Sequence, residues 1–523
     1  MIDRILTVGG ITLLSRVAGF LRDIVLAAVL GAGPLADAFF VALRLPNHFR
    51  AIFAEGAFNA AFVPAYARIR GESGAGPVQL FSDRVFTLLL AIQLVLLAVA
   101  VLFTPWVIDL LAPGFGNDPG RFDLAVEFTR VTFPYLLLVS LVTLYGGILN
   151  SLDRFAAAAA APILLNLSLI MALALAAFFP TAGHAAAWGV LVAGILEVLL
   201  VGGDVARQGV LPRLRWPRFD VEVKLFLKRF GPATIGSAET QIALFADTII
   251  ASFLAAGALS ALYYADRLNQ LPIGVIGIAA GTVLLPEMAR RITAGDEGGA
   301  RHSQNRAIEL TLLLSVPCLV AFVLVPELIM RALFSRGAFT AANAQAAAAT
   351  LMAYAVGLLP FVLMRSATVT FLSRGDTTTP VKALFVAVAV NVALKVLLMD
   401  RYAQVGLAFA TSVGAWINLA LLVWFAARQN LLTIDRHLRQ SSAKLAVAGG
   451  ALAVALFVCE RLVAGLFAHW TTLRDEATLL VLGVIGVVVY GGVVLALFGR
   501  EWLRLFRGRL RPTAPLPRDD ASG

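Results

Sequence analysis

Charged side chains interrupt the first two long apolar runs of the sequence, between Ser15 and Glu55. They are Arg16, Arg22, Asp23, Asp37, Arg44, Arg50 and Glu55. A charge at the centre of a bilayer costs roughly 2.5–3.5 kcal/mol on insertion scales, so several charges in neighbouring spans cannot all face lipid. We therefore expect them to line a wet cavity and to meet a charged partner there.

Arginines outnumber carboxylates in this set, also when Asp266 and Arg267 are added from a later apolar run. The guanidinium group is a planar fork of donors that matches the oxygens of a phosphate, so an arginine-rich cavity suits an anionic guest. An internal ion pair is the alternative for each arginine taken alone. Arg22 with Asp23 and Arg44 with Asp37 are the two examples.

The helical positions of these residues define a polar stripe. At 100° per residue, four side chains of the second run fall within about 20° of one line, namely Asp37, Arg44, His48 and Glu55. Arg50 lies far from that line, but Pro46 is expected to kink the helix and change the angle. His48 fits this stripe better than it fits a catalytic role.

Three polar residues in later spans form a second group. Asp247 lies in one apolar run, and Asn391 and Lys395 lie one turn apart in another. A carboxylate surrounded by oxygens would be a cation site, whereas a carboxylate beside an ammonium is a closed salt bridge. Lys395 favours the salt bridge.

The composition is that of an integral membrane protein. Of 523 residues, 60% are hydrophobic and 14% are charged, whereas soluble domains carry about 25% charged residues. The net charge of +10 is explained by basic loops on one side of a membrane better than by nucleic-acid binding. Cys318 and Cys459 lack disulfide or metal spacing, and no motif of a nucleophile, metal centre or phosphate loop is present. A membrane-embedded transferase needs no fixed motif and stays an alternative.

Apolar runs long enough to cross a bilayer predict about fourteen helices. The expected spans are 5–30, 35–54, 80–104, 124–149, 158–179, 185–203, 232–255, 259–286, 308–334, 344–372, 380–399, 403–427, 443–468 and 477–498. Loops rich in arginine and lysine, such as 207–229, alternate with loops nearly free of positive charge, such as 180–184. The positive-inside rule then places both termini in the cytoplasm.

An internal repeat predicts two related halves. AVLGAGPLADAFFVALRL from Ala28 is similar to SFLAAGALSALYYADRL from Ser252, and FVPAYARI from Phe62 is similar to LLPEMARR from Leu284. Six spans separate the copies, so both halves have the same orientation and enclose a cavity. We expect an all-α fold with an N-lobe over 1–220, a C-lobe over 221–430, two extra helices over 431–500 and a cytoplasmic tail over 501–523.

These motifs resemble the MurJ (MviN) family of lipid II flippases, within the multidrug/oligosaccharidyl-lipid/polysaccharide (MOP) transporter superfamily. The matching pieces are SRVAGFLRD, GAGPLADAFFVALRLPNHFR, IFAEGAFNAAFVP, YYADRLNQLPIGVIGIAAGTVLLP and SRGDTTTPV. The resemblance implies two lobes around a cationic cavity, and a groove between the last two helices that receives a polyprenyl tail.

The resemblance also assigns site residues. Arg22, Arg50 and Arg267 match the family's cavity arginines, which engage the pyrophosphate of lipid II. Further functional positions near the cavity or its gate are matched by Arg16, Asp23, Asp37 and Glu55. A sodium site of some members is matched by Asp247, Asn391 and Thr411, but Lys395 stands where those members have another acidic residue. We therefore expect no bound metal and no cofactor.

The resulting hypothesis is a flippase, not an enzyme. It would move lipid II from the cytoplasmic to the outer leaflet of the bacterial inner membrane by alternating access, for peptidoglycan synthesis and cell shape. Partners would be lipid II, the membrane and candidate peptidoglycan synthases, with no nucleic acid. The alternatives are a flippase for another polyprenyl-linked glycan, a cation-coupled drug exporter, and a scaffold that binds the lipid carrier.

Overall fold

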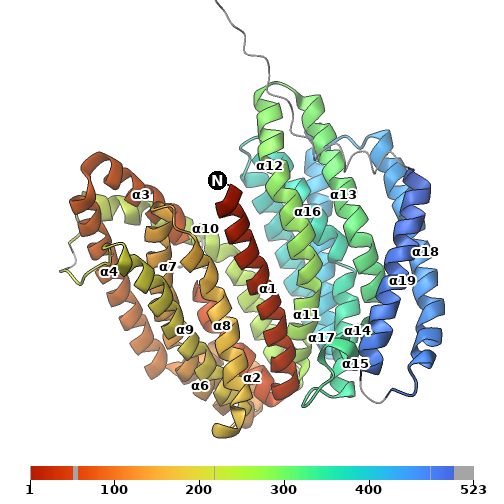
Figure 1. Ribbon diagram of the computed structural model, residues 1–523, viewed down its shortest axis with the longest axis horizontal. Helices are drawn as coiled ribbons and strands as arrows, with labels where there is room; N and C mark the ends of the chain where they lie inside the picture. Colours follow the sequence, from red (N-terminus) through yellow and green to blue (C-terminus); the bar gives the residue numbers. More distant parts are fainter. Residues whose placement is uncertain (1, 51–56, 217, 471–472, 500–523) are drawn as a thin grey trace, which may run out of the picture. The chain divides into compact units, whose positions relative to one another are not determined.

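The computed structural model describes residues 2–50, 57–216, 218–470 and 473–499, and these residues form helices and connecting turns without strands (Figure 1). The helices are α1 (Ile2–Leu30), α2 (Pro34–Phe49), α3 (Ala57–Ser73), α4 (Ala75–Leu102), α5 (Thr104–Leu111), α6 (Pro119–Thr132), α7 (Pro134–Ser151), α8 (Ala156–Ala174), α9 (Ala182–Arg207), α10 (Val221–Ser252), α11 (Ala258–Pro272), α12 (Ile278–Thr293), α13 (Glu297–Leu324), α14 (Pro326–Phe334), α15 (Ala341–Ala355), α16 (Leu358–Leu372), α17 (Thr378–Arg428), α18 (Arg436–Leu466) and α19 (Arg474–Phe498). Short segments η2 (Pro113–Asn117), η3 (Ala176–Phe178) and η4 (Ile273–Gly277) complete the chain order.

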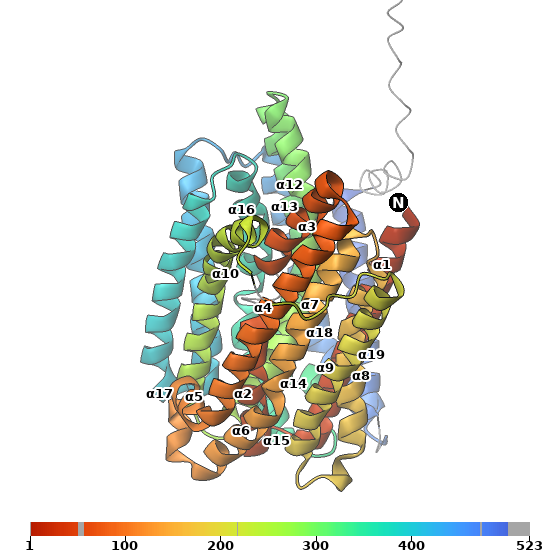
Figure 2. The same cartoon turned by 90° about the vertical axis from the view of Figure 1, so that its left-hand side faces the viewer.

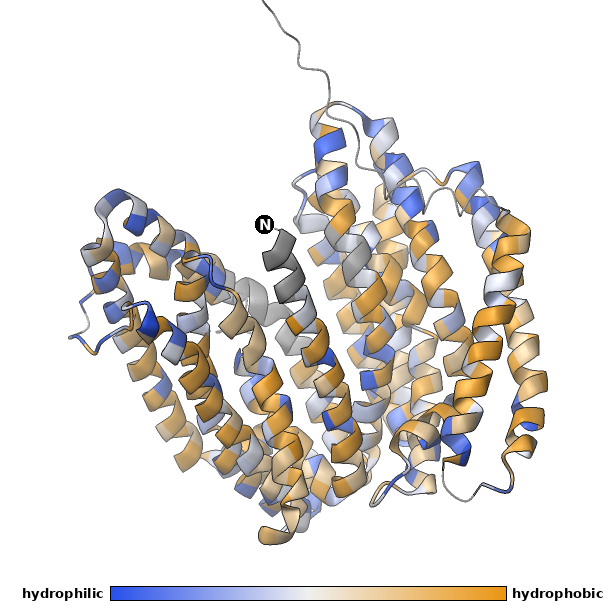
Figure 3. Cartoon of the chain, in the orientation of Figure 1, coloured by the Kyte–Doolittle hydropathy of each residue, from blue (hydrophilic) through white to orange (hydrophobic). Residues whose placement is uncertain are grey.

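The all-α membrane fold predicted from the sequence is confirmed. Nine helical segments of the described residues are long and apolar enough to cross a bilayer. Hydrophobic residues cover most of the length of α18 and α19, and hydrophilic ones gather toward helix ends (Figure 3). That the chain crosses the membrane fourteen times stays a prediction.

Prolines divide several expected spans into two helices. The span expected over 124–149 falls on α6 and α7, because Pro134 starts α7, and Pro326 likewise starts α14 inside the span expected over 308–334. Proline has no backbone N–H and fits the first turn of a helix. Conversely, the spans expected over 380–399 and 403–427 lie in α17, which bends at Ala403, where φ is 45°.

Asp376, from the SRGDTTTPV segment, fixes the start of α17. Its carboxylate accepts hydrogen bonds from the backbone N–H groups of Thr378 and Thr379, both at 3.0 Å, and from the Thr379 hydroxyl at 2.6 Å. The hydrogen bond from the Thr379 hydroxyl, with those from the two N–H groups, lowers the pKa of Asp376 below its usual value. The segment therefore has a local structural role as a helix cap.

The chain divides into two compact units. Unit 1 comprises Met1–Arg267, Leu333–Thr350 and Val388–Thr411, and unit 2 comprises Leu268–Ala332, Leu351–Ala387 and Ser412–Gly523. Unit 1 continues across residue 220, where the sequence predicts the end of the N-lobe. The predicted lobes are defined by the order of membrane spans, whereas these units are defined by contacts between residues. The lobes therefore stay a prediction.

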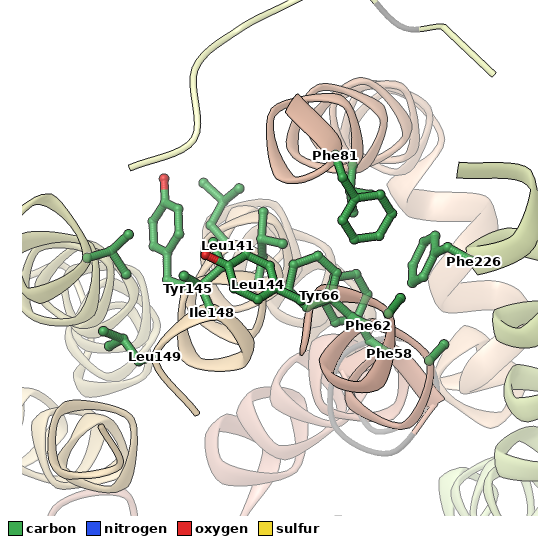
Figure 4. Close-up of a cluster of buried hydrophobic side chains, with 14 of the residues drawn as sticks. Phe58, Phe62, Tyr66, Phe81, Leu141, Leu144, Tyr145, Ile148, Leu149 and Phe226 are labelled. Carbon is green, nitrogen blue, oxygen red and sulfur yellow. The ribbon is translucent and has the colours of Figure 1, made fainter. Parts of the chain in front are cut away.

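An aromatic cluster holds one end of unit 1 together (Figure 4). Phe62 of α3 stacks on Phe58 at 5.1 Å and on Phe81 of α4 at 5.6 Å between ring centroids, and Phe226 of α10 meets Phe81 edge to face at 6.1 Å. Such pairs contribute about 0.5–1.5 kcal/mol each beyond their buried area. In the same unit α7, α8 and α9 run side by side (Figure 2). The cluster fixes α3, which follows residues 51–56.

Unit 2 contains the last two helices, α18 and α19, packed against each other and, through α18, against α13. Gly449 permits the close approach, because a Cβ there would lie 2.8 Å from Val316. The Tyr490 hydroxyl of α19 donates to the carbonyl of Leu313 at 2.8 Å. Large apolar side chains remain exposed on both helices, among them Val454, Phe457, Leu462, Leu480, Val484 and Val487. These faces suit contact with lipid.

Candidate functional site

One carboxylate joins two of the predicted cavity arginines. Asp23 Oδ1 accepts from Arg22 at 2.7 and 3.1 Å, and Asp23 Oδ2 lies 3.6 Å from Arg267 Nε. The Tyr263 hydroxyl donates to Asp23 Oδ1 at 3.2 Å and accepts from Arg267 Nη2 at 3.0 Å. The structure therefore brings Arg22 and Arg267 together around Asp23, from helices α1 and α11. We call Arg22, Asp23, Tyr263 and Arg267 the arginine cluster.

Neighbouring helices hold the arginine cluster in place. Asn166 of α8 accepts from Arg22 Nη1 at 2.9 Å and donates to the carbonyl of Ser15 at 3.0 Å. The Tyr263 ring stacks on Phe40 of α2 at 3.8 Å between ring centroids, and the Arg267 guanidinium lies 4.7 Å from the centre of the Tyr263 ring. A planar cation over an aromatic face is stabilised by the ring quadrupole. Both arginines thus have defined orientations.

The arginine cluster carries a surplus positive charge. Two guanidinium groups share one carboxylate, whose side chain is only 4% exposed, while the Arg267 side chain is 37% exposed. The alternative of an internal ion pair is correct for Arg22 and Asp23. Arg267 adds a second positive charge to the cluster and is more than a third exposed, with Asp266 as a further acidic neighbour. A phosphate could replace Asp23 as the partner of either fork, because both groups accept hydrogen bonds through paired oxygens.

Asp37 has a different environment from the one that the stripe suggests. Its buried carboxylate accepts from the N–H of Gly257 at 2.7 Å, from the N–H of Ser260 at 2.9 Å and from the Ser260 hydroxyl at 2.5 Å. It therefore caps the first turn of α11, where N–H groups lack helical partners. Among the described ion pairs its partner is Arg121 at 3.5 Å, whereas Arg44 donates to Thr248 at 2.9 Å. The suggested pairing of Arg44 with Asp37 is wrong.

The salt bridge expected between Asp247 and Lys395 is confirmed. The Lys395 ammonium, 2% exposed, donates to Asp247 Oδ1. The Thr411 hydroxyl donates to its own helix at Leu407, 3.0 Å away. These residues do not fit a sodium ion, since the ammonium already occupies the carboxylate. Nor do the described residues contain a group of three or more His, Cys, Asp and Glu side chains that could hold a metal.

Arg50 lies at the end of α2 and lines a pocket of about 200 Å³ within unit 1. The pocket lining includes neither Arg22 nor Arg267; its other polar members are Asn59, Tyr135, Thr143, Asn150 and Glu197. The structure thus does not place Arg50 with the arginine cluster. Pro46 does leave the carbonyl of Ala42 without its helical donor, and the Thr132 hydroxyl supplies a hydrogen bond to it at 3.1 Å.

The remaining predicted residues differ in exposure. Arg16 is exposed on α1, and Glu55 lies outside the described residues. The buried His48 packs its ring 4.5 Å from that of Phe245, in keeping with a packing role. Sequence reasoning did not single out Asn166 or Tyr263. Tyr263 precedes Arg267 by one helical turn, which was a usable signal, but Asn166 is a polar residue in an apolar run that nothing links to α1 in the sequence.

Comparison with known proteins places the chain in a family. The family model described as lipid II flippase MurJ matches residues 26–474. A probable lipid II flippase MurJ from Rhizobium tropici is 40% identical over 527 residues, covering 100% of this chain and 98% of the relative. A lipid II flippase MurJ from Burkholderia cenocepacia is 34% identical, covering 80% of this chain and 82% of the relative.

Solved structures agree on the fold. A lipid II flippase MurJ in an inward closed conformation superposes with a TM-score of 0.79 at 23% identity, covering 95% of this chain and 99% of that one. An inward-facing multidrug resistance MATE transporter of the MOP superfamily gives 0.64 at 15% identity, covering 82% of this chain and 98% of that one. With the family model and the relatives in sequence, the chain belongs to the MurJ family of lipid II flippases.

Proposed function

We propose that this chain carries lipid II from the cytoplasmic to the outer leaflet of the inner membrane by alternating access, and that the arginine cluster receives its diphosphate. The observation that carries this is the surplus charge of Arg22 and Arg267 around a single carboxylate. A diphosphate offers more acceptor oxygens than Asp23 and can engage both guanidinium forks. The sugar and peptide would follow the diphosphate through a wet path.

The other predicted residues have supporting roles in this proposal. Arg50 and Arg16 contribute further positive charge to the path, while Asp37 and Glu55 belong to its gates. The two lobes, 1–220 and 221–430, rock about the path, and helices over 431–500 take up the polyprenyl tail. Both termini face the cytoplasm, and peptidoglycan synthases are candidate partners that consume the product.

The membrane potential is the proposed driving force. A potential that is negative inside pushes an anionic headgroup outward and favours the return of the empty cationic site. The work available is about 2.3 kcal/mol per charge per 100 mV. The Asp247–Lys395 salt bridge supports a cycle without sodium. The Lys395 ammonium is part of the protein, so it cannot be released and rebound as a transported sodium ion would be.

Depletion of the protein in its host, followed by measurement of lipid II accessible at the outer leaflet, tests the function. We expect the exposed pool to fall, and wild-type protein but not Arg267→Gln to restore it. Arg154→Gln is the matched control, because Arg154 also pairs with a carboxylate, Asp204 at 2.9 Å, but is exposed. An unchanged exposed pool would remove the lipid II assignment and leave another glycan lipid or a scaffold role.

A further inference from the structure

Glu197 is a buried carboxylate that the site described above does not use. It lies on α9, 2% exposed, in the pocket that Arg50 lines. Removing a carboxylate from water costs several kcal/mol unless a counter-charge and hydrogen bonds compensate. An acidic residue at this depth therefore needs a cation close by.

Arg50 is that cation. Its positive charge acts on the Glu197 carboxylate in the pocket that both residues line, and this carboxylate also accepts a hydrogen bond from the Tyr135 hydroxyl at 3.4 Å. Tyr135 is held by tight packing of α7 on α9, since a Cβ on Gly194 would lie 2.8 Å from the Tyr135 ring. The Glu197 carboxylate is consequently held in a fixed position by a rigid pair of helices.

Arg50, by contrast, is carried by a helix end. Its backbone N–H bonds to the carbonyls of Pro46 and Asn47 in the last turn of α2, and the proline in that turn removes one helical hydrogen bond. Arg50 is only partly buried, so its long side chain can turn toward another anion while the buried Leu45 and His48 of the same turn stay packed. The carboxylate is therefore held in place, whereas the guanidinium can turn.

We propose that Glu197 is a positioning residue that holds Arg50 in the pocket until a diphosphate competes for it. The proposal rests on the proposed function, because it assumes that lipid II is the competing anion. Glu197 then lowers the affinity of the loaded state and recaptures Arg50 when the headgroup leaves. It acts on substrate through Arg50 alone.

The test measures binding and turnover of a soluble short-chain lipid II analogue by the full-length protein in nanodiscs. We expect Glu197→Gln to bind the analogue about tenfold tighter, equivalent to about 1.4 kcal/mol, and to turn over more slowly because Arg50 is no longer recaptured. Glu197→Asp should behave as wild type. Asp204→Asn is the control on the same helix, since Asp204 also pairs with an arginine, and it should change neither quantity.

A double-mutant cycle separates positioning from general electrostatics. In an Arg50→Gln background, Glu197→Gln should leave binding unchanged. Tighter binding that persists in that background, or a monodisperse Glu197→Gln protein that binds no tighter than wild type, would overturn the proposal. If wild-type protein fails to bind the analogue at all, it is the proposed function that fails instead.

Discussion

Two buried aspartates on neighbouring helices, Asp23 and Asp37, have opposite roles although both contact arginine. Asp23 is shared by two cations and a phenol, so an incoming anion can replace it without leaving a backbone group unpaired. Asp37 accepts from two backbone N–H groups at the start of α11, and nothing mobile can take its place. We therefore propose that Asp23 can exchange its partners during transport, whereas Asp37 caps α11.

We expect Asp37→Ala to destabilise the protein by about 3–5 kcal/mol, the usual cost of breaking a buried ion pair. Asp118→Ala is the control, because Asp118 also contacts Arg121, at 3.1 Å, but its side chain is 41% exposed. Its loss should cost about 1 kcal/mol, mainly through the cap that it forms on α6. Thermal unfolding of both purified variants checks this, and equal shifts would contradict the assignment of Asp37 as a structural cap.

We propose that the Asp247–Lys395 salt bridge makes the protein indifferent to sodium. Wild-type protein should show the same melting temperature in sodium and potassium salts. Lys395→Asp removes the ammonium and restores two carboxylates beside Asn391, so its melting temperature should rise with sodium by mass action. A variant with no sodium response would refute the explanation that Lys395 replaces the ion.

Residue identity alone predicted part of the site. The adjacency of Arg22 and Asp23 and the surplus of arginine are visible in the sequence, and the structure confirms the pairing. The partners of Asp37 could not be foreseen, because Gly257 and Ser260 lie more than 200 positions away. Glu197 was missed for a similar reason, since a lone acid in an apolar run does not reveal which arginine faces it.

At the scale of elements, three glycine turns in unit 1 interlock. Gly31, Gly257 and Gly337 all have positive φ, and a Cβ on each would come within 3 Å of a carbonyl oxygen, on Ala338, Ala32 and Ala28 respectively. Glycine is required there both for its backbone conformation and for the space. The turns before α2 and α11, which the internal repeat relates, thus pack directly against each other.

We expect Gly257→Ala to impair folding and complementation far more than Gly209→Ala. Both glycines have positive φ, +90° and +71°, so both variants bear the same conformational cost of about 1 kcal/mol. Only at Gly257 would the new methyl lie 2.9 Å from a carbonyl oxygen, that of Ala32. Thermal unfolding and growth of a depleted strain measure the difference, and similar effects at both positions would exclude the packing contribution.

Hydropathy located the helices well but missed the break at Pro134. A run such as 124–149 stays apolar across Pro134, so a sliding average records one span where the structure has α6 and α7. The bend at Ala403, by contrast, lies at the gap between the spans expected over 380–399 and 403–427, where Asp400 and Arg401 interrupt the apolar run.

At the scale of the molecule, composition predicted the class, and the resemblance of the quoted motifs predicted the family; both are confirmed. The compact units were not predicted. Both copies of the first repeat motif fall in unit 1, except for Leu268 at the end of the second copy, because the turns at Gly31 and Gly257 contact each other across the repeat. The repeat records similarity between two parts of the sequence. The compact units are defined by contacts between elements in one conformation, so the two divisions need not coincide.

Transport should depend on the membrane potential if an anionic headgroup crosses a cationic path. In proteoliposomes, imposing a potential that drives anions in the transport direction should raise the initial rate several-fold, since about 2.3 kcal/mol per charge per 100 mV is available. Replacing sodium by potassium at constant potential should not change the rate. A rate that follows the sodium gradient and ignores the potential would contradict this energetics.

The carboxylate of Asp37 has two effects at once. It caps the first turn of α11, and it links α2 to the turn at Gly257, which packs against the turn that contains Gly31 and Ala32. Those turns cannot separate by degrees, because the first parting would strip two amides and a hydroxyl of their shared acceptor together. We therefore expect separation at this end of unit 1 to be all-or-none, because all three hydrogen bonds end on the two oxygens of one carboxylate.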